Sequence, residues 1–148
     1  MSFAEWAARY DTLDDADRAA IAGLVDGLDH PPTISIVLPV FDTEERFLRA
    51  AIESVRGQLY PHWELCVADD CSTDPRVGQV LAEHAAQDDR IRVARRAENG
   101  HISAASNTAL ELATGRWVAF LDHDDLLAPH ALAMVALELA GRPDAGVV

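Results

Sequence analysis

Lysine is absent from this chain: all twelve of its basic residues are arginine. A phosphate-binding P-loop needs a lysine that contacts the terminal phosphates, and Schiff-base catalysis needs a lysine amine. Both chemistries are therefore excluded within this sequence. If the protein binds a diphosphate, the positive charge must come from arginine, from helix amino termini or from a bound metal ion.

Positive charge in general is scarce, and long apolar runs are missing. Twelve basic residues face 25 acidic ones, and the net charge of −13 disfavours nucleic acid and anionic membrane surfaces as direct partners. No apolar run approaches the roughly 20 residues of a membrane-spanning helix, and the amino terminus lacks the basic start and apolar stretch of a signal peptide. We therefore expect a cytoplasmic protein without a direct membrane span.

Cysteine is also rare, with only Cys66 and Cys71. Two cysteines are too few for a zinc site unless histidines join them, and their surroundings lack such spacing. Cys66 lies in an apolar run and is expected in the core, whereas Cys71 follows two aspartates in a predicted loop. We expect no disulfide between them in a cytoplasmic chain.

The residues that are present predict one ordered domain behind a short helical segment. A chain of 148 residues, 49% of them hydrophobic, can bury a single core. In the segment 1–31, Trp6, Ala7 and Tyr10 share a helical face, and a second helix starts at Thr12–Asp15. Its predicted apolar stripe is Ile21, Leu24, Val25 and Leu28. We interpret this segment, which leads into Pro31-Pro32, as a packing appendage.

Apolar runs alternate with helical patterns over residues 32–148. The predicted strands are 34–38, ended by Pro39, then 63–68, 91–93 and a buried strand 117–121. The predicted helices are one capped by Thr43, one started by Asp74-Pro75, one over 102–113 ended by Gly115, and one over 129–140. The first of them should bury Phe47, Leu48, Ala51, Ile52 and Val55. This alternation predicts a mainly parallel, three-layer α/β sheet with right-handed crossovers. Because residues 146–148 resemble the start of a fifth strand, we expect a truncated domain.

An acidic cluster, Asp122-His123-Asp124-Asp125, follows the last complete strand. Open α/β sheets place their ligands at the carboxyl ends of strands. Carboxylates two positions apart can reach one hard divalent cation, which prefers oxygen ligands and often shares them with substrate phosphates. Acidic clusters also cap helices and fill turns, so the cluster alone leaves both interpretations open.

Further polar segments are predicted at the same edge of the sheet, and as an ordered set they point to a family. The segments are Ile36–Phe41, Ala68–Asp74, Asn99-Gly100 with Ala104–Asn107, and Gly115–Asp125. In order and spacing they resemble the inverting family 2 glycosyltransferases of the GT-A fold, a Rossmann-like α/β architecture. The resemblance covers about residues 33–148, the amino-terminal donor-binding part, and is greatest to bacterial enzymes that build surface polysaccharides.

The resemblance implies how a nucleotide would be held. Pro39, Val40 and Phe41 would line the base and ribose pocket, and Asp70 would hydrogen-bond the base. The loop positions that would shape the pocket near ribose and diphosphate are Asn99, Gly100 and Asn107. In this loop His101 stands where the family often has a small residue.

The resemblance also implies a metal site, because Asp122 and Asp124 correspond to the metal-binding Asp-x-Asp. Asp124 would coordinate Mn²⁺ or Mg²⁺, while Asp122 would contact ribose or the waters of the metal ion. His123 occupies the variable middle position beside the nucleotide, where an exposed polar role is favoured over a ligand or base. Arg95 and Arg96 could assist, although a solvated charge pair is the favoured interpretation.

The implied function is metal-assisted transfer of a sugar, with inversion, from a UDP- or dTDP-linked donor to a glycan or lipid-linked acceptor. A lipid-linked acceptor would place the protein at the inner face of the membrane. The catalytic base of the family comes from the second half of the domain, so no residue here is assigned that role. We expect the base beyond Val148 and no activity from this chain alone.

Other functions fit the residues less well. Haloacid-dehalogenase-type phosphatases also place Asp-x-Asp after an apolar strand, and receiver domains gather acids at strand ends. Both use a lysine, and here the motif follows the fourth strand. Rossmann dinucleotide binding lacks its Gly-x-Gly-x-x-Gly turn. The remaining alternative is a non-catalytic nucleotide-binding remnant without the acceptor half.

Overall fold

The central strand β1 (Ile34–Val40) is buried along its whole length in the computed structural model, which describes residues 2, 5, 12–142 and 146. It lies between β2 (Trp63–Asp69) and β4 (Trp117–Phe120), and β3 (Ile91–Arg95) pairs with β2. The order is therefore β3-β2-β1-β4, and all pairs are parallel. This confirms the predicted parallel α/β sheet.

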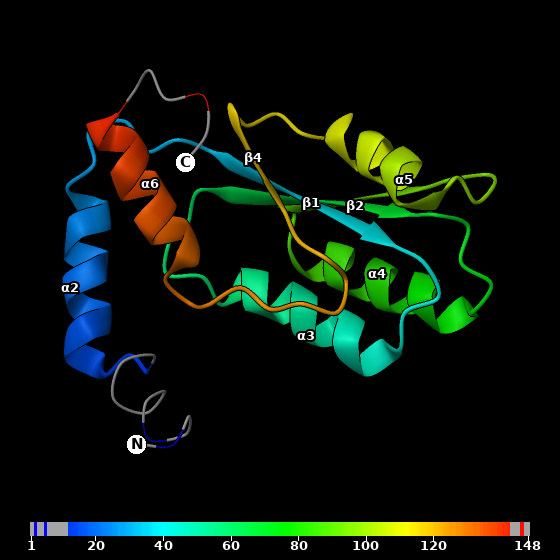
Figure 1. Ribbon diagram of the computed structural model, residues 1–148, viewed down its shortest axis with the longest axis horizontal. Helices are drawn as coiled ribbons and strands as arrows, with labels where there is room; N and C mark the ends of the chain where they lie inside the picture. The colour runs from blue at the N-terminus through cyan, green and yellow to red at the C-terminus, as the bar shows by residue number, and fades with distance from the viewer. Residues whose placement is uncertain (1, 3–4, 6–11, 143–145, 147–148) are drawn as a thin grey trace.

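Helices cover both faces of the sheet, as Figure 1 shows. The helices α3 (Glu45–Arg56) and α4 (Pro75–Gln87) lie on one face, and α6 (Ala131–Gly141) packs there with α2 (Asp15–Asp26). Helix α5 (His101–Leu110) covers the other face. Each complete strand is followed by a helix, which is the predicted alternation.

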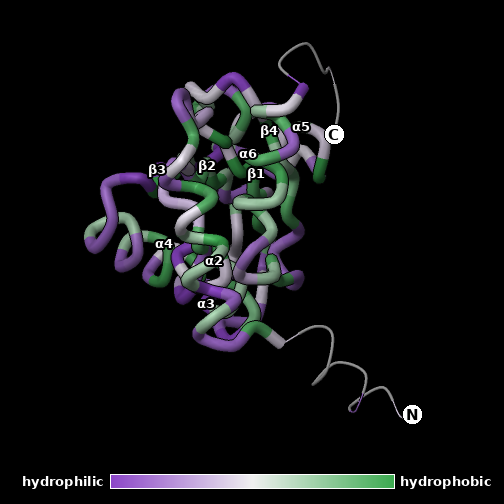
Figure 2. Tube along the Cα trace, turned by 90° about the vertical axis from the view of Figure 1, so that its left-hand side faces the viewer, coloured by the Kyte–Doolittle hydropathy of each residue, from purple (hydrophilic) through white to green (hydrophobic). Residues whose placement is uncertain are grey.

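The two faces of β1 explain why its sequence is apolar at every position except Ser35. Ile34, Ile36, Leu38 and Val40 belong to the larger core against α3, α4 and α6. Val37 faces the other way and joins a smaller core with Cys66, Ala68, Ala105 and Ala109. Hydrophobic stretches of the trace gather around β1 and β2 in Figure 2. A strand buried on both faces is therefore nearly continuous in apolar residues rather than alternating.

Two of the helix starts predicted from the sequence agree with the structure, and a third does not. Asp74 caps α4 through a hydrogen bond from the Arg76 N–H, and Asp14 caps α2 with Asp17 in a capping box. The predicted cap of α3 by Thr43 is wrong. The helix begins after Glu44 without a side-chain cap, and Thr43 is buried.

Two apolar side chains predicted to face the core are exposed instead. Phe47 is 39% exposed with the Arg46 guanidinium over its ring, and Leu24 is 58% exposed. The inward stripe of α3 is already filled by Leu48 and its buried neighbours, so Phe47 lies at the side of the stripe. On α2 it is Val25 that reaches the core.

The entry into β4 also corrects the sequence interpretation. Helix α5 ends at Leu110, so Gly115 is not its cap. A Cβ at Gly115 would lie 2.5 Å from the Thr33 carbonyl oxygen, so glycine is needed here for a close backbone approach. Strand β4 is only half-buried, because α5 leaves Val118 and Phe120 exposed on its face of the sheet. Trp117, expected in the core, is likewise only partly buried.

Two predictions fall on segments that the structure does not describe or describes only at Gly146: the helical face of Trp6, Ala7 and Tyr10, and the start of a fifth strand at 146–148. Both cysteines are free, as expected. Among the described residues, no helix combines the length and the hydropathy needed to cross a bilayer.

One buried carboxylate joins β2 to the entry of β4. Glu64 accepts hydrogen bonds from Ser35 Oγ at 2.6 Å, from the Thr114 N–H and hydroxyl at 2.5 and 2.9 Å, and from the Gly115 N–H at 3.1 Å. It also pairs with Arg92. Burial raises the pKa of Glu64, but these hydrogen bonds outweigh burial and lower the pKa to about 2.

We expect Glu64→Gln to lower the free energy of unfolding at pH 7 by about 2–3 kcal/mol, because a buried hydrogen-bond network loses its charged acceptor. The native pKa of about 2 lies below the ordinary 4.5. The stabilisation is therefore complete above pH 4.5 and is lost as the pH falls toward 2.

Urea unfolding of the chain and the variant at pH 7 and pH 3, followed by tryptophan fluorescence, measures both effects. The exposed Glu111→Gln serves as control. The stability gap between the native chain and Glu64→Gln should narrow at pH 3. A gap of equal size at both pH values would contradict the assignment.

Candidate functional site

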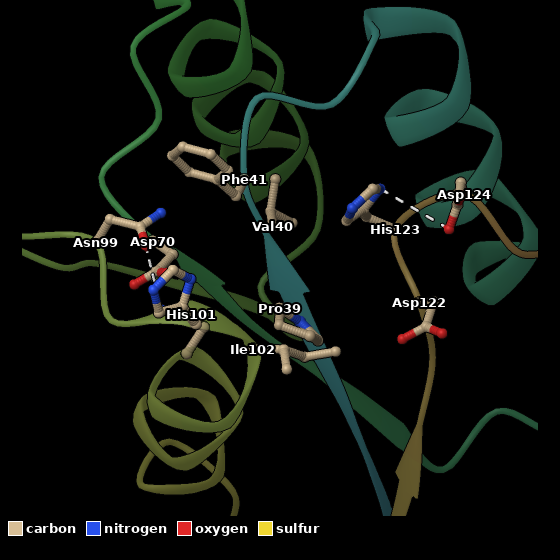
Figure 3. Close-up of a pocket in the computed structure, with 11 residues that line it drawn as sticks. Pro39, Val40, Phe41, Asp70, Asn99, His101, Ile102, Asp122, His123 and Asp124 are labelled. Carbon is tan, nitrogen blue, oxygen red and sulfur yellow. Dashed lines mark hydrogen bonds and ion pairs between the residues drawn. The ribbon is translucent and has the colours of Figure 1, made fainter.

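A hollow of about 540 Å³ opens at the carboxyl end of the sheet, where β1, β2 and β4 end (Figure 3). The residues that line it are Pro39, Val40, Phe41, Asp70, Asn99, His101, Ile102, Ala105, Asp122, His123 and Asp124. Every nucleotide or metal position proposed from the sequence is among them except Gly100 and Asn107. Asn107 is exposed on α5, outside the lining.

Pro39 explains why the sheet opens at this place. The Val37 carbonyl accepts a hydrogen bond from the Leu121 N–H on the β4 side, and Pro39, two residues later, faces the same side. Proline has no N–H with which to continue that ladder. Pairing with β4 stops at Val37 and Phe120, whereas pairing with β2 continues to Val40. The prediction that Pro39 ends the first strand is therefore wrong. Pro39 lies within β1 and ends only the pairing of β1 with β4.

Asp70 holds the loop that precedes α5. Its side chain is 2% exposed, and the Gly100 N–H donates to both carboxylate oxygens at 3.0 and 3.1 Å. The Arg96 Nε lies 2.7 Å from Oδ1. A carboxylate offers about four acceptor sites, so these three contacts leave one for a ligand. Gly100 thus acts through Asp70, without lining the hollow itself.

The prediction of a solvated Arg95–Arg96 pair is wrong for Arg96. Its side chain is 23% exposed, pairs with Asp70 and donates to Thr108 Oγ1 at 2.7 Å. Arg95 is 57% exposed and donates to the Ser72 carbonyl oxygen at 2.9 Å. Neither arginine lines the hollow. The local reason is that Arg96 directly follows β3 and pairs with the buried carboxylate of Asp70, which directly follows the neighbouring strand β2.

Asp42, which the sequence interpretation did not single out, joins the loops after β1 and β2. Its carboxylate accepts from the Thr73 N–H at 2.7 Å, the Thr73 hydroxyl at 2.9 Å and the Asp74 N–H at 3.0 Å. The hydrogen bond from the Asp74 N–H is the main reason that the pKa of Asp42 lies below its ordinary value. An acid directly after the first strand was the only sequence signal for this role.

Backbone strain is concentrated in the same loops. Asp42, Cys71 and His101 have φ values of 45°, 63° and 63°, and they are the non-glycine residues with positive φ in the described part of the chain. Each lies next to, or in, the lining of the hollow. Left-handed backbone at a non-glycine residue costs free energy, and it persists where surrounding contacts impose it. Asp42 has such contacts in its three donors.

The opposite side of the hollow is formed by the acidic cluster. Asp122 and Asp124 are both exposed, and His123 Nδ1 lies 3.9 Å from Asp124 Oδ1. Among the described residues, no group of three or more His, Cys, Asp or Glu side chains is arranged so that it could hold one metal ion. Two carboxylates fit a hard ion that takes its remaining oxygen ligands from a bound phosphate or from water. The donor set therefore suits Mg²⁺ or Mn²⁺ shared with a ligand.

The comparisons with known proteins match this chain to a family. The model of glycosyl transferase family 2 matches residues 35–148. An uncharacterized protein of Sinorhizobium fredii is 53% identical over 135 residues, and the O-antigen biosynthesis protein RfbC of Myxococcus xanthus is 38% identical over 143 residues. These matches cover 88% and 97% of this chain, but the chain spans only 15% and 11% of the relatives.

Solved structures share the fold. TarS 1–349 of S. aureus, in a structure with UDP-GlcNAc, has a TM-score of 0.68 at 26% identity, covering 75% of this chain and 32% of that protein. A mannosyltransferase of Pyrobaculum calidifontis has a TM-score of 0.68 at 23% identity, covering 83% and 39%. The architecture of the chain is accordingly that of the GT-A glycosyltransferases.

We expect the stability of variants at Asp42 to depend on whether the new residue tolerates a positive φ and whether its side chain accepts hydrogen bonds. Asparagine keeps one oxygen acceptor and tolerates a positive φ. Glycine tolerates a positive φ but has no side-chain acceptor, and alanine lacks both properties. The urea midpoint should fall in the order native, Asp42→Asn, Asp42→Gly, Asp42→Ala. An alanine variant as stable as the asparagine variant would show that the three hydrogen bonds and the strain do not matter.

Proposed function

The chain belongs to glycosyl transferase family 2, and from that premise we propose that the hollow binds the nucleotide-diphosphate sugar donor of a glycosyltransferase. The donor would be UDP- or dTDP-linked, and its sugar would pass with inversion to a glycan or lipid-linked acceptor. The single observation that carries the proposal is the convergence of Pro39, Asp70 and Asp122–Asp124 on one cavity. A volume of about 540 Å³ is in the usual range for small-ligand sites.

The two ends of the hollow differ in chemistry, which suggests an orientation for the donor. At the β2 end, Asp70 and Asn99 offer hydrogen-bonding groups beside the apolar walls of Val40 and Phe41. We propose that the nucleoside lies at this end. At the β4 end the acidic pair Asp122 and Asp124 lies across β1, as Figure 3 shows. We propose that the diphosphate lies there.

An acidic end can hold an anionic diphosphate only with added positive charge. Among the described residues no arginine lines the hollow, and the chain has no lysine. Asp124, with Asp122, would hold Mn²⁺ or Mg²⁺, and this ion would act as a Lewis acid toward the charge that grows on the departing diphosphate. The P. calidifontis mannosyltransferase, similar in fold alone, was solved with GDP-Man and Mn²⁺.

Donor binding and sugar transfer need different residues. An inverting transfer requires a base that deprotonates the acceptor hydroxyl. Of the carboxylates in the lining, Asp70 is engaged by Gly100 and Arg96, while Asp122 and Asp124 are assigned to the diphosphate end. We therefore propose that these 148 residues bind the donor and do not transfer sugar alone.

We expect Asp124→Ala to weaken UDP binding in the presence of Mn²⁺ at least tenfold, because the ion loses a carboxylate ligand. Isothermal titration calorimetry with UDP, with Mn²⁺ and with EDTA, measures the effect. Asp125→Ala is the matched control, since Asp125 is adjacent and exposed but lies outside the lining. Equal affinities for the native chain and Asp124→Ala would refute the metal assignment.

The absence of transfer is tested separately. The purified chain should show saturable stabilisation by UDP in a thermal-shift experiment with Mn²⁺, as expected when a ligand binds only the folded state. Incubated with UDP-sugars and a glycan acceptor, it should release no UDP above background. Substantial transfer would overturn the proposal that this chain binds the donor without transferring sugar, and it would place the catalytic base within this chain. UDP stabilisation without transfer is also expected of a non-catalytic nucleotide-binding module.

A further inference from the structure

His101 occupies a backbone position that suits glycine better. Its φ is 63°, in the left-handed region, while the preceding Gly100 has an ordinary φ of −124°. The glycine of this pair therefore does not relieve the strain, and the histidine bears it. Strained non-glycine residues occur preferentially at ligand sites, where the side chain is needed. This makes the imidazole the feature to explain.

The imidazole of His101 lines the hollow and is exposed to it. Its backbone is held, because the His101 N–H donates to Asn99 Oδ1 at 3.2 Å. The ring itself has no hydrogen-bond or ion-pair partner within residues 12–142. Figure 3 shows His101 on the Asp70 and Asn99 side of β1, across the strand from Asp122 and Asp124. It therefore belongs to the proposed nucleoside end.

The other polar groups at this end are largely engaged within the protein. Asp70 accepts from Gly100 and pairs with Arg96, which leaves about one acceptor site. The Asn99 Oδ1 accepts from the His101 N–H, and the Nδ2 of that amide has no hydrogen-bond partner within residues 12–142. The imidazole adds one donor, one acceptor and an aromatic face, all uncommitted.

We propose that His101 is a specificity-determining contact for the base of the nucleotide donor, an inference that rests on the proposed function. Together, His101 and the Asn99 Nδ2 read the edge of the base, and the exposed side chain of Ile102 adds apolar surface. A bound base would cover these exposed groups, and a hydrogen-bonding group that becomes buried without a partner costs free energy, so the imidazole sets which base is preferred. The metal-dependent part of binding is independent of His101.

The decisive variant is His101→Gly, which removes the ring and relieves the backbone strain at once. We expect the variant to be more stable in urea than the native chain and yet to bind the preferred nucleoside diphosphate about tenfold more weakly. If His101 had only a structural role, its replacement would not raise the stability in urea and at the same time weaken nucleotide binding. His101→Asn, which tolerates positive φ and keeps polar groups, should lose less affinity.

Calorimetry with UDP, dTDP, GDP and CDP, each with Mn²⁺ and with EDTA, provides the test. His101→Gly should reduce the ratio between the affinities for the preferred nucleotide and for the others. The factor by which Mn²⁺ increases the affinity, relative to EDTA, should stay unchanged. Ser103→Ala, exposed on the same helix and outside the lining, should behave as the native chain.

Unchanged affinity, a uniform loss for all four nucleotides, or a loss confined to the Mn²⁺-dependent factor would each overturn the assignment of His101. Those outcomes leave nucleotide binding by the native chain intact, so the proposed function survives them. A native chain that binds none of the four nucleotides would instead overturn the proposed function, and this inference with it.

Discussion

The end of pairing between β1 and β4 at Val37 and Phe120 is the constraint on which the rest of the site depends. Because Pro39 cannot donate a ladder hydrogen bond on that side, the chain after β4 is free to leave the sheet. Pairing with β2 continues past this point, so the other wall stays in place. The hollow exists because one side of β1 remains paired while the other does not.

The aspartates around this hollow serve two different purposes. Asp42 and Asp70 make most of their contacts within the protein: Asp42 accepts hydrogen bonds from the loop after β2, and Asp70 accepts from the loop before α5 while keeping about one acceptor site for a ligand. Asp122 and Asp124 remain exposed. In a chain without lysine, the first pair gives the loops their shape, and the second pair is available for a cation shared with a ligand. This division is a matter of hydrogen-bond partners, since all four are the same residue type.

Much of the architecture could be predicted from the sequence. Burial on both faces dictates the apolar runs of β1 and β2, and Asp74-Pro75 specifies a helix start by local chemistry. Errors occurred where neighbouring elements decide the outcome. Phe47 has helical spacing compatible with burial, yet the stripe beside it already fills the core. The run at β4 resembles a buried strand, but α5 does not reach over Phe120.

The sequence by itself determined the succession of strands and helices along the chain and the chemistry at the strand ends, because these follow from local periodicity and residue type, and the ordered set of strand-end motifs carried the resemblance to the family. Only the tertiary structure decided that Asp70 is engaged by Gly100 and Arg96, that Asp42 joins two loops, and that His101 faces the hollow with an uncommitted ring. Each of these depends on contacts between segments about 25 or more residues apart or on a backbone angle imposed by them. No local pattern encodes such contacts, since they arise only when the strands are placed side by side.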